Sequence, residues 1–105
     1  MTCYPGWGDD WLVESREELR LLQLYALEAA SQRLLVAGRF GEAAGLALAA
    51  LGLDPLRESA NRLLIEIHLR DGNRPDALRQ FHKYQQRLRL EMDIAPGPSL
   101  TALIG

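Results

Sequence analysis

The feature of this sequence that most constrains its fold is a repeat with a period of 34 residues. Gly38 and Gly72 are 34 positions apart, and so are Ala43 and Ala77. A glycine permits the left-handed turn that ends a helix. An alanine five positions later lets the next helix pack closely against the first. Because self-similarity at this period is typical of stacked helical hairpins, the spacing predicts an all-α domain built from two such hairpins.

Composition supports a helical rather than a strand-rich chain. Ala, Leu, Arg and Glu dominate the 105 residues, and all four favour helices. Aromatic residues make up 7%, and Thr is rare, which argues against a strand-rich fold. This length suits a single domain that buries a core without disulfides or metals.

The helix signals divide the domain, residues 1–105, into two hairpins. We expect an N-terminal turn segment over 1–9, a first hairpin over 10–53, a second over 54–92, and a C-terminal turn with a short helix over 93–105. Asp54 and Pro55 predict a helix that starts at Pro55 and ends at about Arg70. The first helix, residues 11–37, carries an apolar stripe that we expect to face the core. The stripe consists of Trp11, Leu12, Leu19, Leu22, Tyr25 or Ala26, Ala29, Ala30, Leu34 and Ala37.

Two resemblances follow from these motifs. The stretch from Gly38 through Phe40 and Ala43 to Asp54-Pro55 resembles the second half of a tetratricopeptide repeat. In the second copy Arg74 stands where the aromatic residue is usual, and Tyr84 where a small residue is usual. Over nearly the whole chain, the sequence also resembles the bacterial transcriptional activator domain of the actinobacterial antibiotic regulatory protein family. Three segments carry that resemblance: Pro5-Gly6-Trp7 with Asp10-Trp11 and Arg16, Asp54-Pro55-Leu56-Arg57-Glu58, and Arg87-Leu88 to Met92 with Ala95-Pro96. Asp93 replaces the glycine that is usual in the last segment.

The second resemblance implies a regulatory role. In that family the domain follows a winged-helix DNA-binding domain and is implicated in self-association and in contact with other proteins. It implies a protein–protein interaction and dimerisation module of a transcriptional activator, with DNA reached only through an upstream domain that is absent here. A scaffold or adaptor outside transcription remains an alternative.

Mapping the tetratricopeptide pattern onto the chain predicts a protein-binding groove lined by its first and third helices. The predicted lining residues are Tyr25, Glu28, Gln32, Arg62, Glu66 and Arg70. Such concave surfaces commonly hold a peptide or a partner helix. The opposing interpretation is that Arg62 and Glu66 form only a solvent-exposed pair on one helix.

Two further surfaces are candidates for binding. Arg79, Lys83 and Arg87 repeat every four residues and form a basic stripe that could meet DNA phosphates or an acidic partner. The alternative is an ordinary solvated face, and the net charge of −2 disfavours DNA binding by this chain alone. Trp7 and Trp11 either anchor the N-terminus or form a self-association site, which predicts a homodimer.

The sequence gives little support for chemistry or for a membrane location. His68 and His82 lie on different predicted helices, and no nucleophile–base pair or metal-ligand spacing is evident. We therefore expect no enzyme activity, no catalytic residue, no cofactor and no metal. The single cysteine, Cys3, and the lack of a membrane-length apolar run predict a cytoplasmic protein. That the protein is bacterial is implied by the family resemblance.

Overall fold

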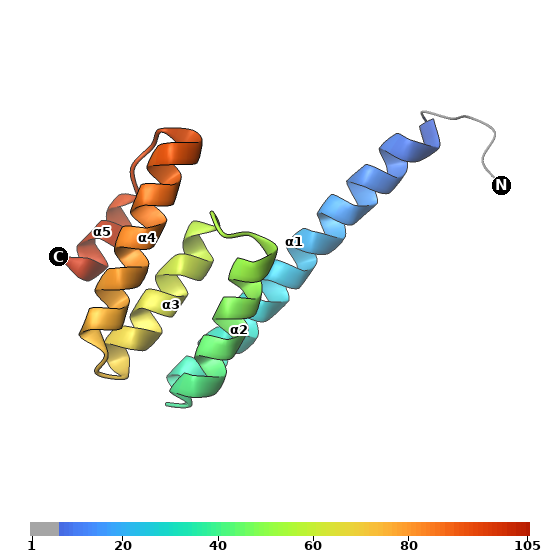
Figure 1. Cartoon of the computed structure of the whole chain (residues 1–105). Coiled ribbons are helices and arrows are strands. Elements are labelled where there is room, and N and C mark those ends of the chain that lie inside the picture. The colour runs from blue at the N-terminus through green and yellow to red at the C-terminus, as the bar shows by residue number, and fades with distance from the viewer. Residues whose placement is uncertain (1–6) are drawn as a thin grey trace.

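The computed structural model describes residues 7–105, with side chains from residue 13 onward, and this part of the chain contains α-helices and no strand. Its elements are α1 (Trp7–Val36), α2 (Phe40–Leu53), α3 (Glu58–Arg70), α4 (Arg74–Met92) and α5 (Pro98–Ile104). Helix α2 packs against α1 and α3, and α3 packs against α4 (Figure 1). The short α5 contacts both α3 and α4. The all-α fold predicted from the sequence is thereby confirmed.

The two glycine turns have the same backbone geometry. Gly38 and Gly72 adopt φ values of +77° and +81°. After Gly38, the Arg39 N–H donates to the carbonyl of Leu34 at 2.9 Å, and after Gly72 the Asn73 N–H donates to the carbonyl of His68 at 2.8 Å. Each donor and acceptor is therefore 34 residues from its counterpart. This bond closes the Schellman turn that a left-handed glycine permits.

Alanines hold the helices close together. Ala43, Ala47 and Ala50 along α2 are fully buried, as is Ala77 at the start of α4. Ala43 and Ala47 pack with Leu35, Leu63, Leu64 and Ile67 in one apolar cluster, whereas Ala77 packs with Ile65, Phe81, Tyr84, Leu88 and Leu100 in another. Helix α3 contributes to both clusters, so it is the element that joins the two hairpins.

The predicted inward face of α1 is wrong over most of its length. Among residues 13–36 the buried ones are Leu24, Ser31 and Leu35, whereas Leu19 and Leu22 are 59% and 66% exposed. Of the predicted stripe, Ala30 and Leu34 are partly buried, and Leu34 packs against the core as predicted. The side chains of Trp11 and Leu12 lie outside the described residues. The prediction failed because α1 carries apolar residues on two opposite faces, and periodicity alone does not tell which one is covered. The helix also begins at Trp7, inside the expected turn segment, and its N-terminal part extends beyond the end of α2 (Figure 1).

The start of the third helix also differs from the prediction. Asp54 accepts a hydrogen bond from the Leu56 N–H at 3.1 Å, and the Arg57 N–H donates to the Asp54 carbonyl at 3.2 Å. These bonds form a turn over Asp54–Arg57, and α3 begins only at Glu58. Asp-Pro is a turn-forming pair as well as a helix start, and here the turn is the outcome.

Candidate protein-binding groove

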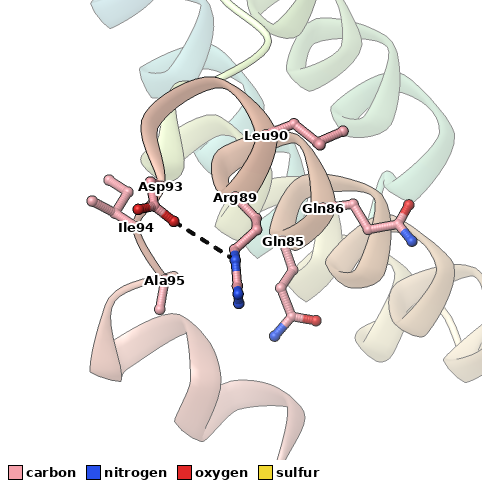
Figure 2. A pocket seen from close by; sticks show the side chains of 7 residues that line it. All are labelled: Gln85, Gln86, Arg89, Leu90, Asp93, Ile94 and Ala95. Carbon is pink, nitrogen blue, oxygen red and sulfur yellow. Dashed lines mark ion pairs between the residues drawn. The ribbon is translucent and has the colours of Figure 1, made fainter.

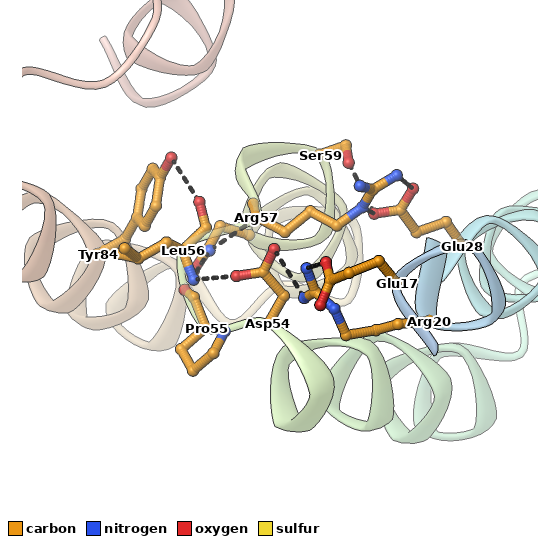
Figure 3. A network of polar contacts seen from close by, with 10 residues as sticks. Glu17, Arg20, Glu28, Asp54, Pro55, Leu56, Arg57, Ser59 and Tyr84 are labelled. Atoms are coloured by element: carbon orange, nitrogen blue, oxygen red, sulfur yellow. Dashed lines mark hydrogen bonds and ion pairs between the residues drawn. The ribbon is translucent and has the colours of Figure 1, made fainter. Parts of the chain in front are cut away.

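A charged pair joins α1 to the beginning of α3. The Arg57 guanidinium donates from Nε to Glu28 Oε2 at 2.8 Å and from Nη2 to Oε1 at 3.3 Å. The Ser59 hydroxyl donates to the same Oε2 at 2.7 Å, and the Arg57 guanidinium also lies 4.8 Å from the centre of the Tyr25 ring. Figure 3 shows the Arg57 guanidinium and the Ser59 hydroxyl both directed at the Glu28 carboxylate. Three donated hydrogen bonds thus fix one carboxylate at the junction of the two hairpins.

The pKa values of this pair reflect its hydrogen bonds. Burial of the Glu28 carboxylate raises its pKa, but the hydrogen bonds from Arg57 and Ser59 outweigh burial and leave the pKa below its ordinary value. The hydrogen bond to Glu28 raises the pKa of Arg57, against the opposing effect of burial. Both groups are therefore held in their charged forms, as expected for a bidentate arginine–carboxylate pair.

A pocket of about 160 Å³ opens beside this pair, between α1 and α3. It is lined by Glu28, Gln32, Ser59, Arg62, Leu63 and Glu66. Four of the six residues predicted for the groove, Glu28, Gln32, Arg62 and Glu66, thus surround one cavity.

The other two predicted groove residues lie next to the pocket rather than in its wall. Arg70 forms an ion pair with Glu66 at 2.8 Å, and its side chain is 52% exposed. Tyr25 is 62% exposed and lies under the Arg57 guanidinium.

Arg62 does not form an ion pair with Glu66, which was the alternative interpretation of these two residues. Its Nη1 instead donates to the Ser99 hydroxyl at 3.3 Å, which links the pocket to α5.

A second carboxylate, Glu58, ties α3 to the C-terminal turn. It accepts a hydrogen bond from the Tyr84 hydroxyl at 3.0 Å and from the Gly97 N–H at 3.1 Å. A Cβ added at Gly97 would overlap the Glu58 carboxylate. Burial, followed by the hydrogen bond to Glu58, raises the pKa of Tyr84. Sequence reasoning did not find this contact, because its members are 26 and 39 residues apart and share no local pattern.

The Asp54–Glu58 segment therefore acts as a connector. Asp54 lies 3.7 Å from Arg20 of α1, which also pairs with Glu17 at 3.1 Å (Figure 3). Arg57 reaches α1, and Glu58 reaches α4 and the turn before α5. One pentapeptide thus contacts α1, α4 and the turn before α5.

The basic stripe is present on α4, but two of its members are paired with acids of the same helix. Arg79 donates to Asp76 at 2.7 Å, and Arg87 donates to Glu91 at 2.8 Å. The hydrogen bond from Arg79 lowers the pKa of Asp76. Lys83 and Arg87 also line a shallow pocket of about 210 Å³, whose other walls include Leu48 and Leu51 of α2.

A wider hollow lies at the end of α4. Gln85, Gln86, Arg89, Leu90, Asp93, Ile94 and Ala95 line about 580 Å³ of open space, with Arg89 pointing toward Asp93 (Figure 2). The Arg89–Asp93 distance is 3.7 Å, and both side chains are at least 80% exposed. An ion pair this exposed contributes little to the stability of the fold.

The Trp7 and Trp11 side chains lie outside the described residues, so the predicted self-association site at these two positions stays a prediction. Within residues 7–105, no helix combines the length and the apolar character needed to cross a bilayer.

Comparison with known proteins identifies the family. The model of the bacterial transcriptional activator domain matches residues 4–105, and the chain belongs to that family. Comparisons with curated proteins and with solved structures found no significant match. The family is one of transcriptional regulators and not of enzymes.

Proposed function

We propose that this chain is a protein–protein interaction and dimerisation module of a transcriptional activator, and that its groove holds a segment of a partner protein. Membership of the bacterial transcriptional activator domain family supports the regulatory setting. The observation that carries the binding role is the pocket between α1 and α3, where groups of both charges lie around the single apolar residue Leu63. In this proposal the helices form a tetratricopeptide-like stack, and the protein works in the cytoplasm. DNA is bound by a separate winged-helix domain.

The groove combines rigid and available groups. Glu28 is fixed by Arg57 and Ser59, and the buried Leu63 is the one apolar residue of the lining. Arg70 is half-exposed, so a partner carboxylate can reach its guanidinium without breaking the fold. A fixed wall with charged groups at its edge suits a short extended segment or one helix face of a partner.

The structure offers less support for direct DNA contact. Two of the three cations in the basic stripe are already paired within α4, and the net charge of the chain is −2. Proteins that bind DNA alone obtain most of their affinity from phosphate neutralisation. A role outside transcription is disfavoured by the family match, which covers residues 4–105.

The experiment is a reporter assay with the chain fused to a DNA-binding domain of known operator. We expect the fusion to raise transcription, and we expect Arg70→Glu to reduce the increase because it repels the acidic partner group and Glu66. Arg79→Glu is the matched control, since Arg79 also pairs with an acid of its own helix but lies on α4, away from the groove. Equal activation by both variants would reject the groove, and an effect of Arg79→Glu alone would favour the basic stripe.

A further inference from the structure

The two ends of the helical stack are capped differently. At the C-terminal end α5 covers α3 and α4, and its Leu100 is fully buried. At the N-terminal end the outer face of α1 is exposed to solvent. Stacked helical repeats need a polar outer face on their terminal helix to remain soluble and monomeric. The outer face of α1 does not meet that requirement.

The exposed stripe consists of Leu19, Leu22, Ala26 and Ala29, spaced by three, four and three residues. Leu19 and Leu22 are 59% and 66% exposed, and both alanines are exposed as well. At 3.6 residues per turn this stripe lies roughly opposite the buried Leu24. The spacing is that of a helix–helix contact seam, with an apolar residue at every third or fourth position.

We propose that a second copy of this chain covers the stripe. The two α1 helices are antiparallel, and the two-fold axis crosses the exposed stripe at the height of Leu24 along the helix. This inference rests on the dimerisation part of the proposed function and assigns its surface. In this register Leu22 packs on the partner's Ala26, and Leu19 packs on the partner's Ala29. Each large side chain meets a small one, which is the pattern that fills an interface without gaps.

The charges flanking the stripe fit the same register. The partner's Arg33 comes level with Ser15, between Glu14 and Glu18 of the first copy, and symmetry repeats the contact. Among the ion pairs of residues 13–105, none involves Arg33, Glu14 or Glu18. A parallel register would instead place leucine on leucine, alanine on alanine and Arg33 on the partner's Arg33, which leaves gaps and opposes like charges.

The same pairing covers the projecting part of α1. Arg20 lies 3.7 Å from Asp54, the residue that follows α2, and the N-terminal part of α1 extends past this end of α2 (Figure 1). In the dimer this projecting part lies along the partner's α1. From Ser15 to Arg33 the contact is about 28 Å long at 1.5 Å per residue. A single helix pair of this length buries on the order of 1,000 Å², which is below the standard size for a stable complex. An interface of this size suits a weak, concentration-dependent dimer.

The first test compares two leucine variants by sedimentation equilibrium from 1 to 200 μM, a range chosen to span micromolar association. We expect Leu22→Glu to weaken dimerisation by at least about tenfold, because it places charge at an apolar contact beside the axis. Leu90→Glu is the matched control: Leu90 is 86% exposed on α4, a helix that does not contact the described part of α1. Circular dichroism checks that both variants keep the helical content of the unmodified chain.

The second test determines direction and register in a Cys3→Ser background. Under mild oxidation, a mixture of the Leu22→Cys and Ala26→Cys proteins should form a mixed disulfide dimer, whereas each protein alone should not. Alone, the two identical cysteines stay apart by about four residues along the axis, beyond the reach of a disulfide. A parallel pair would instead crosslink efficiently in each protein alone, which would overturn the proposed register.

The possible results distinguish a dimer contact at the α1 stripe from self-association through another surface. Loss of the dimer in Leu22→Glu alone, together with the mixed crosslink, supports the stripe. A dimer that survives Leu22→Glu unchanged would overturn the stripe while leaving self-association in place. A chain that is monomeric at every concentration would overturn both.

Discussion

Replacing Arg57 with methionine tests how the two hairpins are held together. The change removes the guanidinium but keeps an unbranched side chain over the Tyr25 ring. Glu28 then loses both hydrogen bonds from Arg57, at 2.8 and 3.3 Å, and keeps only the one from Ser59. The side chains of Arg57 and Glu28 are 16% and 14% exposed, so water replaces the lost partner only in part.

The expected loss of unfolding free energy is about 2 kcal/mol. Breaking a fully buried pair costs roughly 3–5 kcal/mol, and an exposed pair contributes about 0–1 kcal/mol. This pair lies between those limits, nearer the buried one. For a domain of this size, about 2 kcal/mol corresponds to a decrease in Tm of about 10 °C. Urea unfolding followed by circular dichroism measures the loss, at a protein concentration low enough to keep the chain monomeric.

A double-mutant cycle with Glu28→Gln and a pH series isolate the pair. Because the folded pKa of Glu28 is lowered from its ordinary value near 4.5, the stabilisation is fully present above pH 4.5. It is lost as the pH falls through the folded pKa. The difference between the original chain and Arg57→Met should therefore shrink in acid. A loss below about 0.5 kcal/mol at pH 7, or additive single changes, would refute the assignment of this pair as the link between hairpins.

Three further substitutions, each followed by urea unfolding, test a strained backbone position, a close contact and a buried hydrogen bond. Asp93→Gly should stabilise the chain by about 1 kcal/mol, because Asp93 has a φ of +55° and its pair with Arg89 is too exposed to offset the gain; an unchanged midpoint would contradict the strain. Gly97→Ala should destabilise it by about 1–3 kcal/mol, since the added Cβ overlaps the Glu58 carboxylate; a neutral result would mean that this side chain moves freely. Ser31→Ala should cost about 1 kcal/mol, because the buried Ser31 hydroxyl donates to the Ala43 carbonyl at 2.8 Å, and no loss would show that the bond adds nothing.

Much of the fold could be predicted because its signals are local. Gly38 and Gly72 mark helix ends through a backbone requirement that one residue carries, and the 34-residue spacing then implies equivalent turns. The same 34-residue spacing also predicted which face of α3 lines the groove. Whether Arg62, Glu66 and Arg70 bind a protein stays a prediction, although the structure places Arg62 and Glu66 around one pocket.

The rest depended on contacts between distant parts of the chain. Nothing near Glu28 in the sequence indicates that Arg57, 29 residues later, will bind it. The face of α1 that enters the core could not be predicted either, because Ala50 of α2 and Ala60 of α3 pack with Leu24 and leave Leu22 outside, and both are leucines in one helix. Which face is covered is decided by the neighbouring helix, and periodicity carries no information about that choice.

We propose that this domain works by associating with protein, first of all with a second copy of itself. Light scattering on a sizing column, over loading concentrations from about 1 to 200 μM to bracket micromolar association, measures this self-association. We expect a mass that rises from one chain toward two as the concentration increases. The mass of a single chain at every concentration would contradict it and would leave the groove between α1 and α3 as the remaining binding surface.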